Sequence, residues 1–514
     1  MRSRRRTRPL ALAALWGAAW AIAATSAAAI PLRPTAVAKR FGVYAWGFDD
    51  SSYTVCPTCP DRLNWAADKV AEAGSRTIRV YLGASDPYGV NPPVNPEDAG
   101  YLARIVAGAG YPSFTSETAY AQLFADPRFD TYLLTVYSPA DNRGDWTDGY
   151  GRDEADLERE QIAQLGDVLL RGFRGKTFIL LNWEGDNAIH GHAGDPTAWD
   201  SYVAWARTRA AGVRESQARN AGGARRLLAG LEFNLVRRNG VWCGSDDSLA
   251  HRCVLDYVGS RVDVDYYSYS SWDTLAIKAF DPTANLKQEI GASLGYALDL
   301  LRRAHPGLTP ANLLLGELGF ARTAPRNGEC RAAQYLKELV GALAAPDAFG
   351  VSYAIVWQAI DNAPSVDVDG GTFGLFRGSD GGPTLSGTVF RSLLRGGRDK
   401  ATAPLACPRL NACHDNPANS CGAVNAEADW TPRFSIDSTL SIFGLNFSRA
   451  GNAVQVIQGG RRYVLPRDGG FAWHESPGQV NVALPPGLEA GPAFVYVTDA
   501  RGLDSNGQLL DLQP

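Results

Sequence analysis

Residues 313 to 320 read LLLGELGF. The run is mostly apolar, and it contains a glycine, Gly316, followed by a glutamate, Glu317. A continuous apolar run is typical of a parallel strand that is buried on both faces. In barrels of parallel strands, the reactive groups lie at the carboxyl ends of the strands. We therefore expect this stretch to be a barrel strand that presents Glu317 at the mouth of the barrel.

Short β-rich runs like this one recur along the chain and alternate with amphipathic helices, which indicates parallel strands with crossover helices. In residues 162–173 and 286–301, apolar residues recur at helical spacing and predict one buried stripe on each helix. The pattern predicts a (β/α)8 TIM barrel over residues 30–399, in which the long segment 84–130 shapes the cleft. The eight predicted strand runs are 41–47, 77–83, 132–137, 177–184, 227–234, 262–270, 312–320 and 351–358.

Residues 1–29 have the three parts of a secretory signal peptide: five early arginines, an apolar run from Leu10 to Ala24, and small residues at 27–29. An uncleaved anchor is the alternative, but the run is short for a spanning helix. We expect a secreted, periplasmic or cell-surface protein without a membrane segment after cleavage. The net charge of −4 becomes −9 once the five arginines are removed, which does not suggest a nucleic-acid partner.

Eight cysteines in an exported chain favour disulfides. The spacing of Cys243 and Cys253 suits a disulfide within one loop. Cys56 and Cys59 have the spacing of a redox motif or half a zinc site, yet no second pair accompanies them, so we expect a structural disulfide there.

The chain changes character after the predicted barrel. Residues 400–430 contain three cysteines and no periodicity, which indicates a linker. Residues 431–514 contain short alternating runs between Gly and Pro turns, as in a small β-sandwich. Two stretches, LSIFGLNFS and VNVALPPGLEAGPAFVYVTDARG, resemble the immunoglobulin-like IPT/TIG domain.

Two glutamates, Glu184 and Glu317, are expected at the carboxyl ends of the fourth and seventh barrel strands. Cleavage of a glycosidic bond needs one carboxyl that donates a proton and one carboxylate that attacks or activates water. The sequence GELGF around Glu317 and the later Trp357 resemble the clan-A glycoside hydrolases, as does the segment FGLFRGSDGGPTLSGTVFRSLL. Together with the predicted signal peptide, the resemblance implies a secreted retaining glycoside hydrolase that acts on β-linked poly- or oligosaccharides.

The resemblance also implies roles for individual residues. Glu317 would be the nucleophile and Glu184 the acid/base, with Trp357 beneath the reacting sugar. Arg79 would hydrogen-bond the nucleophile, and either Tyr267 or Tyr269 would be the tyrosine of the sixth strand.

The clan places Asn directly before its acid/base Glu, whereas this chain reads Asn182-Trp183-Glu184. Strand alternation would put Asn182 and Glu184 on one face, and a bulge would separate them. Asp186 is the alternative acid. Asn234 either binds a sugar hydroxyl or caps a strand end. A lone glutamate on a strand is more often part of a structural ion pair than a catalyst, and Glu232 is an example of this risk.

We expect a raised pKa for Glu184 and an ionised Glu317 beside Arg79 and a tyrosine hydroxyl. No cofactor is expected, and no metal is assigned to the pair His190 and His192, which lies in a predicted loop. The competing hypothesis is a carbohydrate-binding or cell-surface protein that keeps the barrel without turnover.

Overall fold

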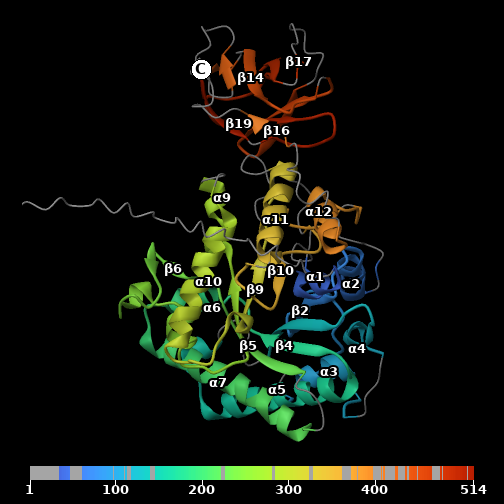
Figure 1. Ribbon diagram of the computed structural model, residues 1–514, viewed down its shortest axis with the longest axis vertical. Helices are drawn as coiled ribbons and strands as arrows, with labels where there is room; N and C mark the ends of the chain where they lie inside the picture. Colours follow the sequence, from blue (N-terminus) through green and yellow to red (C-terminus); the bar gives the residue numbers. More distant parts are fainter. Residues whose placement is uncertain are drawn as a thin grey trace, which may run out of the picture.

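The computed structural model contains a closed barrel of eight parallel strands followed by a smaller all-β unit (Figure 1). It describes residues 34–46, 59, 61–95, 98–108, 110–112, 117–138, 145–221, 226–280, 284–322, 328–345, 347–361, 372–378, 380–396, 407, 409–410, 423–425, 434–436, 439–448, 450–465, 475–476, 478–505 and 507–514. The predicted signal peptide, residues 1–29, lies outside the described residues.

The barrel strands follow one another around the barrel in chain order, and the last strand pairs with the first. This arrangement confirms the (β/α)8 fold, and each strand lies within or close to one of the eight predicted runs. The barrel strands are β1 (Phe41–Tyr44), β2 (Thr77–Gly83), β3 (Thr131–Tyr137), β4 (Thr177–Leu181), β5 (Leu227–Phe233), β8 (Tyr266–Ser270), β9 (Leu313–Leu318) and β10 (Ala354–Val356).

Helices surround the barrel, and the main apolar core lies between them and the strands. The predicted stripes at 162–173 and 286–301 fall on α5 (Arg152–Gly172), with Phe173 as its C-cap, and on α10 (Leu286–Arg302). Local caps start several helices: Asn285, for example, accepts the backbone N–H groups of Lys287 and Gln288 at the start of α10. The helices are α1 (Pro34–Arg40), α2 (Arg62–Glu72), α3 (Tyr101–Ala107), α4 (Ala119–Ala125), α5 (Arg152–Gly172), α6 (Gly185–Ala188), α7 (Pro196–Arg219), α8 (Trp272–Leu275), α9 (Ile277–Phe280), α10 (Leu286–Arg302), α11 (Gly328–Ala344) and α12 (Leu385–Leu394).

Every residue of β9 is buried, as its apolar run predicts. Leu314 belongs to the cluster that fills the barrel interior, together with Leu133, Ile179 and Ile355. Leu313 and Leu315 belong to the core between strands and helices. The strand is therefore held on both faces, and its carboxyl end carries Glu317 at a fixed height in the barrel.

The C-terminal unit consists of two sheets that pack around a second core, separate from that of the barrel. One sheet contains β11 (Arg409–Leu410), β12 (Ala423–Asn425), β14 (Thr439–Leu445), β17 (Glu475–Ser476) and β18 (Gln479–Ala483). The other contains β13 (Phe434–Ser435), β15 (Ala453–Gln458), β16 (Arg461–Leu465), β19 (Gly491–Thr498) and β20 (Gln508–Gln513).

The predicted β-sandwich is thus present, while the likeness to IPT/TIG domains stays a prediction. Both β11 and β12 come from the segment expected to be a linker, and both pair with β14. Strands of two or three residues are too short to show alternation, which is why the sequence did not reveal them.

Two disulfides are described. Cys243 and Cys253 are joined as predicted, and a second bond links Cys330 of α11 to Cys407, just before the C-terminal unit. Cys59 is also disulfide-bonded, whereas Cys56 lies outside the described residues. Among the helices that the structure describes, none combines the length and the apolar character needed to cross a membrane.

Candidate active site

A cavity of about 950 Å³ opens at the carboxyl ends of the barrel strands. Such a position is where barrels of this type carry their reactive groups. Its lining combines two glutamates with many aromatic side chains: Tyr44, Trp46, Tyr81, Ser85, Pro87, Thr135, Tyr137, Trp183, Glu184, Asn187, Asn234, Leu235, Trp272, Asp273, Glu317, Trp357 and Phe373. Ser85 and Pro87 come from the segment 84–130 that was expected to shape the cleft.

Glu184 and Glu317 both contact one hydroxyl group. Oγ of Ser270, at the end of β8, is 3.0 Å from Oε1 of Glu184 and 3.1 Å from Oε2 of Glu317. Two oxygens that contact the same atom at hydrogen-bond distance are no more than about 6 Å apart. The structure therefore brings the two predicted catalytic carboxyls together, and both line the cavity.

The two oxygens of Glu317 have different surroundings. Oε2 accepts a hydrogen bond from Nε1 of Trp272 at 3.1 Å in addition to its contact with Ser270. Oε1 lies 3.5 Å from Nη1 of Arg79 and, within the described part of the chain, accepts no hydrogen bond. One oxygen is thus oriented by donors, and the other is left with an unused lone pair.

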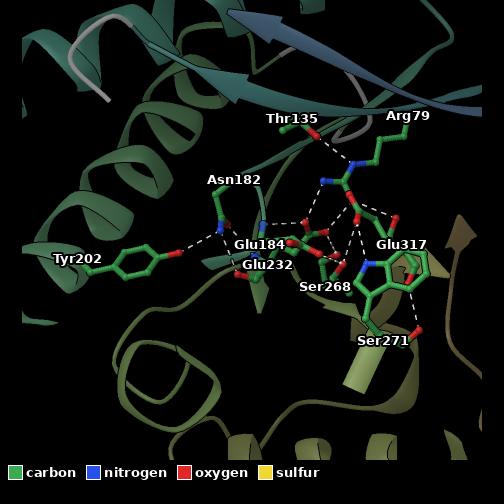
Figure 2. A network of polar contacts seen from close by, with 12 residues as sticks. Arg79, Thr135, Asn182, Glu184, Tyr202, Glu232, Ser268, Ser271 and Glu317 are labelled. Carbon is green, nitrogen blue, oxygen red and sulfur yellow. Dashed lines mark hydrogen bonds and ion pairs between the residues drawn. The ribbon is translucent and has the colours of Figure 1, made fainter. Parts of the chain in front are cut away.

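The main partner of Arg79 is Glu232 of β5 rather than Glu317. Its two terminal nitrogens donate to the two oxygens of Glu232 at 2.8 and 2.9 Å, and Nε donates to Thr135 at 2.9 Å (Figure 2). Both members of the ion pair are fully buried. The expected hydrogen bond from Arg79 to the nucleophile is therefore replaced by a longer ionic contact.

Neither predicted tyrosine reaches Glu317. The hydroxyl of Tyr267 donates to the backbone oxygen of Val262, and that of Tyr269 donates to Asp273. Alternation along β8 is the reason: the tyrosines point toward the surrounding helices, and the small residues Ser268 and Ser270 point into the barrel. This alternation in YYSYS was visible in the sequence and could have indicated the serines.

The backbone at Glu184, which follows Asn182-Trp183, has an unusual conformation. Glu184 has φ +25°, in the left-handed region that non-glycine residues rarely adopt. Its backbone N–H donates to Oε1 of Glu232 at 3.1 Å. Asn182 takes a structural role instead of facing the cavity: its side chain bonds the backbone N–H and C=O of Glu232 and the hydroxyl of Tyr202 (Figure 2).

Asp186, the alternative acid, is buried and is not part of the cavity lining. Its oxygens accept three backbone N–H groups, from Asn234, Leu235 and Val254. Burial raises the pKa of Asp186 to about 6. Asn234 does line the cavity, but its side-chain oxygen accepts the backbone N–H of Asp186 at 2.9 Å. These contacts tie the loop after β4 to the loop after β5.

The electrostatics of the site follow from three carboxyls that share one arginine. Burial raises the pKa of Glu184, and the charge of Glu232 raises it further. Burial also raises the pKa of Glu317; Arg79 opposes this shift, while Glu184 and Glu232 add to it. Glu317 was expected to stay ionised without such a rise, but burial outweighs an arginine whose charge is largely paired with Glu232.

Trp357, which the family resemblance implies beneath the reacting sugar, lines the cavity beside Tyr44 and Trp46. Its ring centroid is 5.1 Å from that of Tyr44, in an edge-to-face arrangement, and 6.2 Å from that of Trp46, in a stacked one. Trp272 and Ser270, which both contact Glu317, were not predicted. Trp272 follows β8 by two residues, and no local pattern marks its indole as a donor to a strand that lies elsewhere in the sequence.

Metal ligation finds little support among the described residues. The one cluster with suitable spacing is Cys243, Cys253 and Asp256, and its two cysteines are already joined to each other. His190 and His192 lie in a short exposed turn.

Comparisons with known proteins find fold neighbours only. No family model and no curated protein matches the sequence. A GH5_18 protein from Streptomyces cattleya in complex with GlcNAc is 17% identical with a TM-score of 0.45, over 71% of this chain and 82% of that one. A GH5_18 protein from Bifidobacterium longum subsp. infantis is 16% identical with a TM-score of 0.45, over 75% and 87%.

An exo-beta-1,4-mannosidase from Opitutaceae bacterium strain TAV5 is 14% identical with a TM-score of 0.43, over 71% of this chain and 60% of that one. At these identities and scores, the likeness assigns no function to this chain.

Proposed function

We propose that this protein is a secreted retaining glycoside hydrolase that cleaves β-linked poly- or oligosaccharides, with Glu317 as nucleophile and Glu184 as acid/base. The observation that carries the proposal is the pair of carboxyls on one hydroxyl, Ser270, in an aromatic-lined cavity. The C-terminal sandwich is then an accessory or spacing unit.

The separation of the carboxyls supports retention. Retaining enzymes hold the two groups about 5 to 5.5 Å apart, whereas inverting enzymes leave about 6.5 to 9.5 Å for a water molecule. The shared contact with Ser270 holds the nearest oxygens no more than about 6 Å apart, which is below the range of inverting enzymes. Direct attack on the sugar by Glu317 fits this spacing.

The chemistry divides between the two glutamates. Glu184 donates its proton to the glycosidic oxygen while Glu317 attacks the anomeric carbon, and the aglycone leaves. Glu184 then takes a proton from water, which displaces Glu317 and restores the original configuration. Raised pKa values for both groups suit this cycle, because one proton must stay on the pair near neutral pH.

Hydrolysis of a panel of β-linked gluco-, manno- and xylo-oligosaccharides tests the proposal. We expect Glu317→Gln to abolish turnover and Glu184→Gln to lower kcat/KM by about 100- to 10,000-fold, the usual size of a general acid–base contribution. Glu338→Gln is the control, because Glu338 pairs with Lys278 outside the cavity lining. NMR of the first-formed product should show the same anomeric configuration as in the substrate.

Two outcomes would contradict this function. Binding of glycans without hydrolysis by the wild-type protein would favour the non-catalytic alternative. A first product with inverted anomeric configuration would be consistent with a glycoside hydrolase but would exclude Glu317 as nucleophile.

A further inference from the structure

Glu232 is a third carboxyl in the site, yet it does not line the cavity. Its side chain is fully buried and accepts four hydrogen bonds: two from Arg79, one from Ser268 at 2.7 Å and one from the backbone of Glu184. A carboxylate with this many donors has no lone pair left for a substrate. Its effect on a reaction must pass through the groups that it holds.

We propose that Glu232 is a positioning residue that binds both terminal nitrogens of the Arg79 guanidinium. Because Arg79 is paired in this way, Glu184 and Glu317 together keep one negative charge. This inference rests on the proposed function. Figure 2 shows Glu232 in contact with both Arg79 and the backbone of Glu184, with Glu317 close to the same guanidinium.

The geometry around Arg79 supports the first part of the proposal. A guanidinium binds one carboxylate best through two parallel N–H donors, and this fork is directed at Glu232. Nη1 additionally donates to the backbone oxygen of Gly316 at 3.0 Å. Glu317 receives only the 3.5 Å contact, so its charge is neutralised much less than that of Glu232.

The charge count supports the second part. The charged and titratable groups facing Glu232 are Arg79 of β2, Glu184 after β4, Glu317 of β9 and Tyr44 of β1. Burial raises the pKa of the Tyr44 hydroxyl, so it carries no charge. One cation among three carboxyls favours retention of a proton by Glu184 and Glu317, which is the state that acid/base catalysis requires.

The glycine before Glu317 has a role in the same arrangement. A side chain at Gly316 would overlap Glu232 and Ser268 and would press on Arg79. The strand β9 can thus pass directly over the ion pair only because this residue has no side chain. Gly316, in LLLGELGF, therefore leaves room for the side chain of Glu232 and also precedes Glu317 in the strand.

Glu232 also supports the backbone of Glu184. The left-handed conformation at Glu184 is costly for a residue with a side chain, and its N–H is fixed by Oε1 of Glu232. The same carboxylate therefore places the proposed acid/base and sets the charge next to it.

Glu232→Gln tests the proposal because it keeps the shape and removes the charge. With one negative charge gone and Arg79 free to pair with Glu317, the pKa values of Glu184 and Glu317 should both fall. We expect both limbs of the pH profile of kcat/KM to move to lower pH by about one unit. Titration of the carboxyl 13C signals of Glu184 and Glu317 should show the same shift without any need for turnover.

A matched control is available in Glu158→Gln. Glu158 is likewise fully buried and paired with an arginine, Arg209, at 3.0 Å, but neither residue lines the cavity. This variant should lose stability while its pH profile and the 13C titrations of Glu184 and Glu317 stay those of the wild type.

A neutral replacement of the whole ion pair covers the case in which Glu232→Gln does not fold because Arg79 is left without its main partner. In Arg79→Met/Glu232→Gln, the pKa of Glu317 should rise and that of Glu184 should fall, since Arg79 acts more on the former and Glu232 more on the latter. The active pH range should then narrow from both sides.

The results separate the two proposals. Wild-type titration curves in a folded Glu232→Gln protein, or in the double variant, would overturn the role of Glu232. Absence of hydrolysis by the wild type on every glycan would overturn the proposed function, and the 13C titration would still decide whether Glu232 controls the pair.

Discussion

Ser270 has one hydroxyl proton and two carboxyl neighbours. It can donate to only one of them, so the second contact is a hydrogen bond only when that carboxyl is protonated and donates to Oγ. The 3.0 and 3.1 Å contacts therefore suit a site in which one of Glu184 and Glu317 carries a proton. Such a residue orients both groups without reacting itself.

We expect Ser270→Ala to lower kcat/KM by about tenfold, the usual cost of losing a hydrogen bond to a charged group. The bond from Ser270 lowers the pKa of Glu184, so its loss should move the basic limb of the pH profile upward. Steady-state kinetics between pH 4 and 9 would measure both effects. Ser352→Ala is the control, since Ser352 is bonded to Ala311 at an exposed site.

Trp357 supplies a flat apolar face in the cavity, supported by Tyr44 and Trp46. A sugar ring stacks on such a face through its C–H groups, so Trp357→Ala should weaken substrate binding and raise KM by about tenfold. Trp357→Phe keeps part of the face and should lie between the alanine variant and the wild type. A loss of kcat with unchanged KM would contradict a binding role.

Asp186 is buried and connects the loops after β4 and β5 through hydrogen bonds. At low pH its carboxyl is protonated and neutral. Its folded-state pKa of about 6 is above that of an unfolded aspartate, so its stabilising contribution is full below about pH 4 and is lost as pH rises through 6. The shift corresponds to about 3 kcal/mol. The free energy of unfolding should fall between about pH 4 and 6 in the wild type.

Asp186→Asn is the corresponding variant, and its free energy of unfolding should depend less on pH over this range. Part of the dependence should remain, because burial also raises the pKa of Asp256 and Asp361 to about 6. Urea titrations at several pH values would measure the two slopes. Identical slopes would exclude Asp186 as a source.

The loop between β5 and β8 carries the Cys243–Cys253 disulfide and contributes Val254 to the N–H groups around Asp186. The bond constrains this loop in the unfolded chain and should be worth about 2 to 3 kcal/mol. We expect Cys243→Ser/Cys253→Ser to lower Tm by several degrees and to lower activity as well, because Asn234 and Leu235 line the cavity. Differential scanning calorimetry and kinetics would test this, and unchanged activity would show that the loop holds its shape without the bond.

The protein has two separate apolar cores, one in the barrel and one in the sandwich, and the orange-to-red strands form their own unit beyond one end of α11 (Figure 1). The Cys330–Cys407 bond joins the two units, and Gly328 at the start of α11 packs against Asp504 and Ser505. Through this contact and the disulfide, one unit can affect the stability of the other.

We expect calorimetry to show two unfolding transitions. In Cys330→Ser/Cys407→Ser, the transition of the sandwich should move to lower temperature, while hydrolysis by the barrel should persist. A single transition that shifts as a whole would indicate one cooperative unit.

The barrel could be predicted because strand and helix periodicity are local properties of the sequence, and eight runs in β–α alternation allow few other arrangements. Local sequence also indicated the sandwich, the Cys243–Cys253 bond and the strand ends that carry Glu184 and Glu317. The two-residue strand β11 and the bond from Cys330 to Cys407 left no such trace, because each depends on a partner far along the chain.

The pairing within the site likewise depended on packing in three dimensions. Arg79 has two carboxylates within reach, and its choice of Glu232 over Glu317 follows from where β5 and β9 place them around the barrel. The pKa of Glu317 is raised mainly by burial, and the extent of burial cannot be predicted from the sequence. LLLGELGF thus determined a buried strand with an acid near its end, and the surrounding strands determined the charge and the contacts of that acid.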